Sequence, residues 1–181
     1  KHWSILWDEN YKNKATAKDS VRDTYVVGVM HVYYDELMEL RTQYENNEIS
    51  GSEYNKQIGQ IMNRCDKDTI AKVETALKEM KNNLYGFEVD SGKSDIVTGK
   101  VAINFAWSGD AVYSLDVAEE ENEVYLNYQV PEEGSNVWFD GWVMPKGANK
   151  ELAQSFVNFL CNPEIAVRNM NYIGYTSSIA G

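Results

Sequence analysis

Residues 101–122, VAINFAWSGDAVYSLDVAEEEN, predict a β-strand that runs directly into an α-helix. Residues 101–107 are mostly apolar and include β-branched side chains, which favour a strand. The pair Ser108–Gly109 then provides a flexible turn before the helical stretch. Upstream, LYGFEVD at 84–90 predicts another strand, and residues 91–99 leave room for one or two helical turns. Strands that alternate with helices predict an α/β fold in which a sheet is flanked by helices.

The segment 19–82 is predicted to be almost entirely helical, because apolar residues recur there at helical spacing. Asp19 or Ser20 can cap the first helix, and a second helix follows a break, with Ser52 as its cap. A third helix is expected over 66–83. Its buried stripe is expected to consist of Ile70, Val73, Leu77 and Met80.

The C-terminal half continues the alternation of strands and helices. Residues 123–131 and 136–144 predict two more strands, so that 85–144 would supply most of the sheet. Helices are expected at 149–161 and 163–172, the second with a proline at its start, where proline is tolerated. The first fifteen residues, by contrast, are expected to be a connecting segment with aromatic anchors.

The composition limits the classes of function. The chain has 181 residues, and its net charge of −11 argues against nucleic-acid binding, which needs clustered Lys and Arg. Its two cysteines, Cys65 and Cys161, and its two histidines have no metal-ligand spacing, so no metal or cofactor is predicted. We expect the cysteines to be unpaired. No apolar run is long enough to cross a membrane.

Several aromatic residues lie near the ends of predicted elements, where ligands bind in open α/β sheets. Trp107 ends a strand, and Tyr175 follows a helix. Trp138 lies two residues before Asp140, on the same face of the strand predicted there. Aromatic rings attract organic cations and carboxylates accept hydrogen bonds from ammonium groups, so this combination predicts a site for an organic cation. Each ring taken alone could equally belong to the core or anchor a loop.

Four segments carry a family resemblance: HWSILWDENYKNK at 2–14, KDSVRDTY at 18–25, VAINFAWSGDA at 101–111, and the run from VWFDGW to IGYTSS at 137–178. Together they resemble the spermidine/putrescine-binding proteins of ABC importers, which have the two-lobed periplasmic-binding-protein type II fold. The last run is the most specific, because its order and spacing hold over more than forty residues. The resemblance covers nearly the whole chain.

The resemblance implies the polyamine contacts. Trp107 and Trp138 would form aromatic walls, and Asp140 would accept a hydrogen bond from an amine. Tyr175 would add a wall or a hydroxyl contact. Asp23 stands where the family usually has Glu and would offer the same charge on a shorter side chain. The place of Asp23 in the first turn of a helix, where the helix dipole stabilises a carboxylate, explains it equally well.

The chain departs from the family pattern at several positions. Ser20 stands where many members have Asp, which removes one ammonium partner. Asp110 stands where a small polar residue is common, and it could restore that partner. Val89 occupies a position that usually contributes a serine, and Asp90 is the nearest polar residue. These differences leave the choice between spermidine and putrescine open.

The resemblance also implies a domain organisation and a location. Residues 1–135 would form the second-lobe α/β domain, with a helical insertion around 34–64. Residues 136–181 would form the strand that returns through the hinge and two helices of the first lobe. Most of the first lobe has no counterpart in the sequence, so we expect a piece of a longer protein. That protein would be extracytoplasmic, in the periplasm or on the outer face of the cytoplasmic membrane, with a lipid anchor or a fused permease.

Other functions stay open at this point. A related carrier could bind iron or another small organic cation instead, with the adjacent Tyr33 and Tyr34 as candidate iron ligands. An enzyme such as a glycosidase could use paired carboxylates. A helical interaction domain could use 19–82 as its working surface. The resemblance favours a non-enzymatic binding protein that delivers polyamines to the transmembrane subunits of an ABC permease.

Overall fold

A small parallel sheet lies at the centre of the computed structural model, which describes residues 1–179. Its three strands are β1 (Ala15–Lys18), β2 (Gly86–Glu88) and β3 (Ile103–Asn104), in the spatial order β2-β1-β3. Thr16 of β1 pairs with Gly86 on one side and with Asn104 on the other. The predicted strands at 84–90 and 101–107 are therefore confirmed in shortened form, and the α/β class is confirmed with them.

The central strand β1 was not predicted, because ATAK is short and follows a segment that reads as a connection. Ala15 and Ala17 are fully buried, and their small side chains let helices pack close to the sheet. The residues before β1 form two 3₁₀ helices, η1 (Trp3–Trp7) and η2 (Glu9–Tyr11). The expected aromatic anchoring is confirmed, since the Trp7 indole Nε1 donates to the Ala76 carbonyl at 2.8 Å.

The predicted helical segment 19–82 is confirmed. It contains α1 (Val21–Val32), α2 (Tyr34–Glu45), α3 (Gly51–Met62) and α4 (Lys67–Asn83). Ser20 caps α1, but the cap of α3 is Ser50 rather than Ser52, because the helix begins at Gly51 and the Ser50 hydroxyl accepts from the Glu53 amide at 3.2 Å. In α4, Val73 and Met80 are fully buried and Leu77 is partly buried, whereas Ile70 is 45% exposed.

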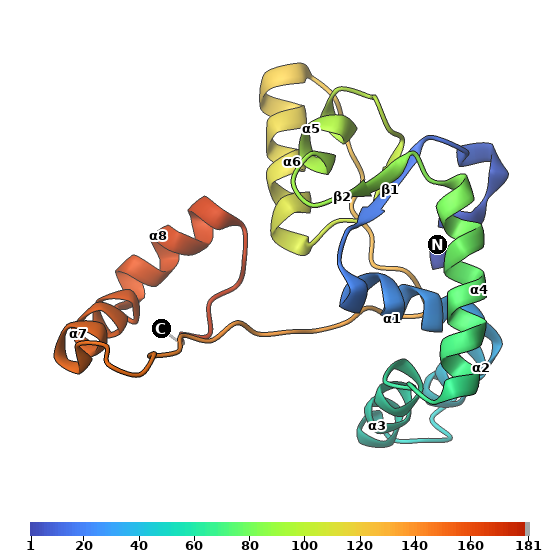
Figure 1. Ribbon diagram of the computed structural model, residues 1–181, viewed down its shortest axis with the longest axis horizontal. Helices are drawn as coiled ribbons and strands as arrows, with labels where there is room; N and C mark the ends of the chain where they lie inside the picture. The colour runs from blue at the N-terminus through green and yellow to red at the C-terminus, as the bar shows by residue number, and fades with distance from the viewer. Residues whose placement is uncertain (180–181) are drawn as a thin grey trace.

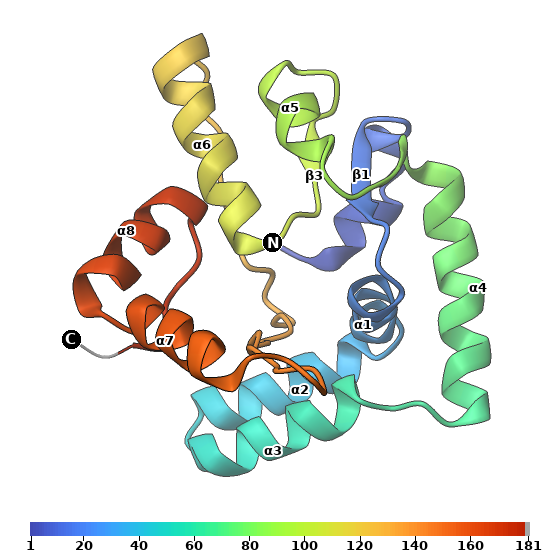
Figure 2. The same ribbon diagram turned by 60° about the vertical axis from the view of Figure 1, so that its left-hand side comes forward.

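Helices cover the sheet from two sides (Figures 1 and 2). Helix α4 packs against α1 on one side, and α5 (Gly92–Val97) packs against α6 (Ser108–Asn122) on the other. The contact between α1 and α4 is close at Gly28, where an added Cβ would lie 2.7 Å from the Val73 Cγ1. Most of the apolar core lies between β1, α1, α4 and η1.

The strands predicted at 123–131 and 136–144 are wrong: the structure has neither helix nor strand from Glu123 to Asn149. The alternating apolar pattern is present, but a strand also needs a neighbour that satisfies its backbone groups, and no described segment lies beside it as a ladder partner. As far as Gly134 this connection packs on the body, since Glu133 is buried and accepts from the Trp3 amide at 3.0 Å.

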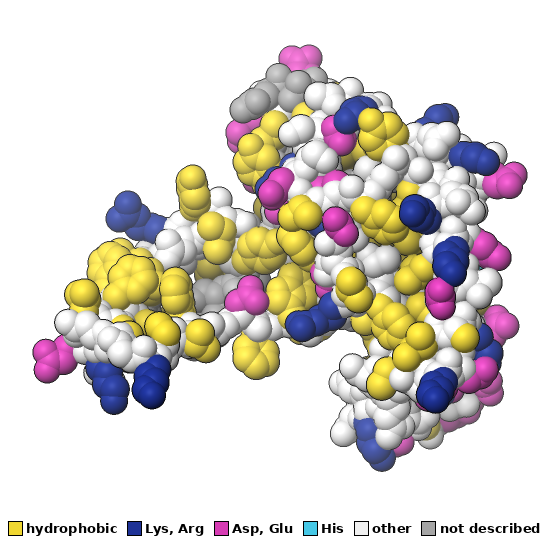
Figure 3. Space-filling model, viewed as in Figure 1, with side chains coloured by type: hydrophobic (Ala, Val, Ile, Leu, Met, Phe, Trp, Pro, Cys, Tyr) yellow, Lys and Arg dark blue, Asp and Glu magenta, His cyan; other side chains and the backbone are white. Residues whose placement is uncertain are grey.

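The last two helices, α7 (Lys150–Leu160) and α8 (Pro163–Ile173), confirm the helices expected there. They pack against each other at the end of the extended connection (Figure 1), and the C-terminal end of α8 at Gly174 reaches the body at Gly109 in α6. Apolar side chains gather over this pair on the face that Figure 3 shows. The exposed apolar residues of the two helices include Leu152, Phe156, Phe159, Val167, Tyr172 and Ile173. Both cysteines are free, as expected.

Candidate functional site

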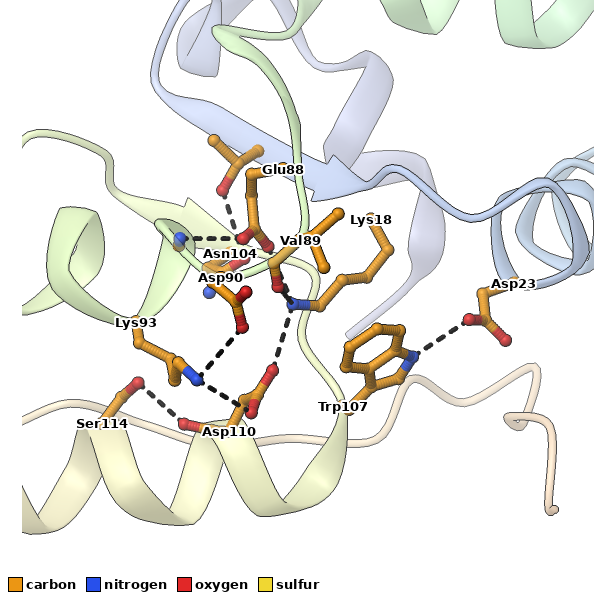
Figure 4. Close-up of polar contacts among 12 residues, drawn as sticks. Lys18, Asp23, Glu88, Val89, Asp90, Lys93, Asn104, Trp107, Asp110 and Ser114 are labelled. Carbon is orange, nitrogen blue, oxygen red and sulfur yellow. Dashed lines mark hydrogen bonds and ion pairs between the residues drawn. The ribbon is translucent and has the colours of Figure 1, made fainter. Parts of the chain in front are cut away.

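A buried lysine ends the central strand. Lys18 is 1% exposed, and its Nζ donates to the Val89 carbonyl at 2.8 Å (Figure 4). The same nitrogen lies 3.0 Å from Glu88 Oε1 and 3.2 Å from Asp110 Oδ2. Glu88 is also buried, and its Oε2 accepts from the Gly92 amide at 2.9 Å. The charge of Lys18 is therefore balanced by carboxylates from β2 and from the first turn of α6.

A second lysine approaches Asp110 from α5. Lys93 Nζ lies 3.5 Å from Asp110 Oδ1 and 3.5 Å from Asp90 Oδ1. Burial alone would lower the pKa of Lys93, but the negative charges of Asp110 and Asp90 outweigh burial and raise that pKa above its ordinary value. Both oxygens of Asp110 thus face an ammonium group.

Asp23 lies on the other side of Trp107, in the first turn of α1. Its Oδ2 accepts a hydrogen bond from the Trp107 indole Nε1 at 3.0 Å, and its Oδ1 accepts one from the Asn136 amide at 2.9 Å. Both donors are neutral. Within residues 1–179, no basic side chain forms an ion pair with this half-buried carboxylate. Since each carboxylate oxygen can accept more than one hydrogen bond, Asp23 can still receive an ammonium group.

Trp107 separates these two arrangements. The Lys18 ammonium lies 4.4 Å from the centroid of its ring, a cation–π contact, while the indole N–H points to Asp23. Trp107 itself is partly exposed. The ring therefore holds a cation of the protein on one side and leaves part of its surface accessible.

Tyr175 joins the C-terminal segment to this site. Its ring lies against Gly109 at the start of α6, where an added Cβ would overlap the ring. Gly174, at φ 72°, ends α8 and brings its own backbone next to Gly109. Burial raises the pKa of Tyr175, and so do the negative charges of Asp110 and Asp140, although a hydrogen bond with the Asp110 backbone acts in the opposite direction. Asp140 is thus near enough to act on Tyr175.

The remaining expected residues lie less close together. Trp138 is 43% exposed and Asp140 is exposed, both in the extended connection. The Ser20 hydroxyl accepts from the Asp23 amide at 3.4 Å as the cap of α1. The structure therefore assembles Asp23, Trp107, Asp110 and Tyr175 around the start of α6, with Ser20 behind Asp23.

Four residues of this site were missed from the sequence: Lys18, Glu88, Lys93 and Asn136. Lys18 could have been noticed as the only charged residue of ATAK, two residues before the helix cap Ser20. Asn136 directly precedes the aromatic run at 137–142, but nothing in its local sequence indicates a bond to Asp23.

Metal binding, with Tyr33 and Tyr34 as iron ligands, was one of the alternatives that the sequence left open. No group of three or more His, Cys, Asp or Glu residues within 1–179 could hold a metal ion. The Tyr33 hydroxyl bonds to that of Thr69 at 2.8 Å, whereas the Tyr34 ring packs edge-on against His2, so the two tyrosines have different partners. No helix in the described part of the chain is long and apolar enough to cross a membrane.

Sequence comparison places the chain among bacterial proteins. The profile of the family described as "Bacterial extracellular solute-binding protein" matches residues 1–181. The spermidine/putrescine-binding periplasmic protein of Salmonella typhimurium is 24% identical over 174 residues, which cover 96% of this chain and 41% of that protein. The putrescine-binding periplasmic protein SpuD of Pseudomonas aeruginosa is 42% identical over 74 residues, covering 40% of this chain and 20% of that protein. The chain thus spans less than half the length of these relatives.

Two solved structures share the fold. The spermidine/putrescine ABC transporter substrate-binding protein PotD of Streptococcus pneumoniae, in complex with calcium and HEPES, is 28% identical with a TM-score of 0.63. A protein described as a candidate spermidine/putrescine ABC transporter from Listeria monocytogenes is 26% identical with a TM-score of 0.71. The matches cover 98% and 99% of this chain, and 46% of each of those chains.

Proposed function

Because the chain belongs to the bacterial extracellular solute-binding protein family, we propose that it supplies one wall of a cleft that binds a polyamine such as spermidine or putrescine. The Salmonella relative and the Streptococcus structure are described as spermidine/putrescine-binding, and SpuD as putrescine-binding. The full-length protein would be the extracytoplasmic solute-binding component of an ABC importer and would deliver its ligand to the permease subunits.

One observation carries this proposal: Asp23 is a half-buried carboxylate with two neutral donors and no basic partner within residues 1–179. A partly buried carboxylate without a cation is costly, so its retention beside an aromatic ring favours a ligand that brings the cation. The ammonium group would bond to Asp23 while its methylenes lie against Trp107.

The connection and the last helices would complete the site. Asp140 would take a second ammonium group, and Trp138 and Tyr175 would cover the methylenes between the two. Residues 1–135 would act as the second lobe, with α2 and α3 as its insertion, and residues 136–181 would belong with the first lobe. The exposed apolar side chains of α7 and α8 fit packing against further chain, which in the longer relatives is more than half of the protein. Closure of the two lobes would then enclose the ligand.

Isothermal titration calorimetry of the full-length gene product tests this proposal. Spermidine, putrescine, maltose and ferric ion would be titrated in turn. We expect saturable binding of at least one polyamine and none of maltose or ferric ion. Binding of the sugar or the metal without binding of either polyamine would contradict the proposal.

A further inference from the structure

We propose that Lys18 is a specificity-determining residue: its ammonium group occupies the inner end of the cleft and excludes an additional amino group of the ligand. This inference rests on the polyamine cleft proposed above and extends it to the number of charges that the cleft accepts. It begins from the chemistry of the side chain, since lysine ends in four methylenes and an ammonium group. The same chemistry forms one end of a polyamine.

The groups around the Lys18 ammonium are of the kinds that bind amines. Its ammonium group has Glu88 Oε1 at 3.0 Å, Asp110 Oδ2 at 3.2 Å and the Val89 carbonyl at 2.8 Å. It also lies 4.4 Å from the centroid of the Trp107 ring. Two carboxylates, a carbonyl and an indole are the groups that would hold a ligand ammonium. In this protein the Lys18 ammonium group occupies the position that a ligand ammonium group would otherwise take.

A ligand ammonium group at the same place would find carboxylates whose charge is already balanced by lysines, and it would be repelled by those lysines. Lys93 lies 3.5 Å from the second oxygen of Asp110, so neither oxygen of that carboxylate is without a lysine. Asp110 also lies in the first turn of α6, where the helix dipole disfavours a cation. The expectation that Asp110 restores the ammonium partner lost at Ser20 is therefore replaced: Asp110 serves Lys18 and Lys93.

Asp23 offers the opposite environment across the same ring. It has only neutral donors, and no basic side chain within 1–179 pairs with it. A ligand chain that lies along Trp107 therefore finds one uncompensated carboxylate at Asp23 and a cation at Lys18. Its end is expected to stop at Trp107, which favours a ligand with fewer amino groups.

The test compares the dissociation constants of putrescine, with two amino groups, and spermidine, with three. Calorimetry on the full-length protein gives the ratio of the two constants for each variant. In Lys18→Met the ammonium group of Lys18 is removed, so that Glu88 Oε1 and Asp110 Oδ2 can accept from one more ammonium group of the ligand, while Lys93 still pairs with Asp110 Oδ1. We expect the ratio to shift toward spermidine by about tenfold, as for one added charge-assisted hydrogen bond.

Two further variants make the result decisive. Lys93→Met removes a less buried cation from the same carboxylate, and we expect a smaller shift in the same direction. Lys100→Met changes the net charge equally, but its partner is Asp95 at 2.9 Å, and we expect no shift. If Lys18→Met does not fold, the difference between Lys93→Met and Lys100→Met decides.

Each outcome has one meaning. A structural role of Lys18 would weaken both polyamines alike and leave the ratio unchanged, which would overturn the inference and leave the proposed function intact. Equal shifts in all three variants would attribute selectivity to net charge and would also overturn it. Absence of binding of either polyamine by the natural protein would instead refute the proposed function, and the inference with it.

Discussion

Carboxylates near Trp107 fall into two groups that differ in what balances their charge. Glu88 and Asp110 face Lys18, with Lys93 on the far side of Asp110. Among residues 1–179, the side chain of Asp23 accepts from the indole of Trp107 and the amide of Asn136 and has no basic partner, and Asp140 lies exposed in the connection. The first group is internally neutralised and joins β1, β2 and α6. The second group has no basic partner within residues 1–179, and in the proposed function it is the group that binds the ligand.

The largest effect is expected from breaking the internally neutralised group. Lys18→Met leaves Glu88 and Asp110 without their shared cation, and loss of one partner of a buried ion pair costs about 3–5 kcal/mol of the free energy of unfolding. Urea denaturation of the variant measures this cost. The control is Lys72→Met, which removes an exposed i,i+4 partner of Asp68 on α4 and should cost less than about 1 kcal/mol. Equal costs in the two variants would show that burial of Lys18 does not matter.

A smaller loss is expected from separating Tyr175 from the start of α6. Gly109→Ala places a methyl group where the Tyr175 ring now lies, so the ring and the end of α8 must move. Overpacking of this kind lowers the free energy of unfolding by about 1–3 kcal/mol. Urea denaturation measures the loss of stability and polyamine titration the effect on binding, with Gly59→Ala as the control, because a Cβ there has nothing within 4 Å. Unchanged binding in Gly109→Ala would separate Tyr175 from the site.

Trp138 and its neighbour Phe139, both in the connection, are expected to differ in their effect on ligand binding. Trp138→Ala should weaken polyamine binding by about 1–2 kcal/mol through lost cation–π contact. Phe139→Ala removes an aromatic side chain from the next position, which is almost fully exposed. We expect Phe139→Ala to leave calorimetric affinity nearly unchanged. The reverse order of the two losses would contradict the assignment of Trp138.

The smallest effect belongs to an ion pair at the surface. Hydrogen bonding from Arg64 lowers the pKa of Glu36 below its ordinary value of 4.5, against the opposing effect of burial. The pair therefore stabilises the fold fully above pH 4.5, and this contribution is lost as the pH falls through the lowered value. Because Glu36 is 47% exposed, solvent screening limits the contribution to under about 1 kcal/mol. The free energy of unfolding of Glu36→Gln, measured by urea denaturation, should be lower than that of the natural protein above pH 4.5. The two values should become equal as the pH falls through the lowered pKa of Glu36.

Local patterns predicted the helices well and the sheet poorly, and the reason is physical. Helices such as α4 satisfy their backbone within one segment, so apolar spacing and caps are sufficient to predict them. A strand needs a partner that is distant in sequence, so ATAK was missed although it lies at the centre. The 136–144 segment has the pattern of a strand and no described partner, and it was predicted wrongly for the same reason.

Sequence patterns likewise indicated some residues of the candidate site and not others. The motif around Trp107 and the helix start at Asp23 were visible in the sequence, because the resemblance depends on those segments. The bond from Asn136 and the pairing of Lys18 with Asp110 join residues 113 and 92 positions apart, and no local pattern reports them. Asp110 was consequently taken as a free ligand contact, whereas its two oxygens face two lysines.

In the proposed function, individual carboxylates without a basic partner bind the ligand, rather than the general negative charge of the chain. Calorimetric titration of spermidine and putrescine with Asp23→Asn, Asp140→Asn and Glu120→Gln distinguishes the two. We expect the first two variants to lose about 1.5–3 kcal/mol of binding free energy, because a charge-assisted hydrogen bond becomes neutral. Glu120→Gln, in the exposed acidic part of α6, should lose almost nothing. Equal losses in all three variants, fading together as salt is added, would show that the long-range field holds the ligand and would contradict the account.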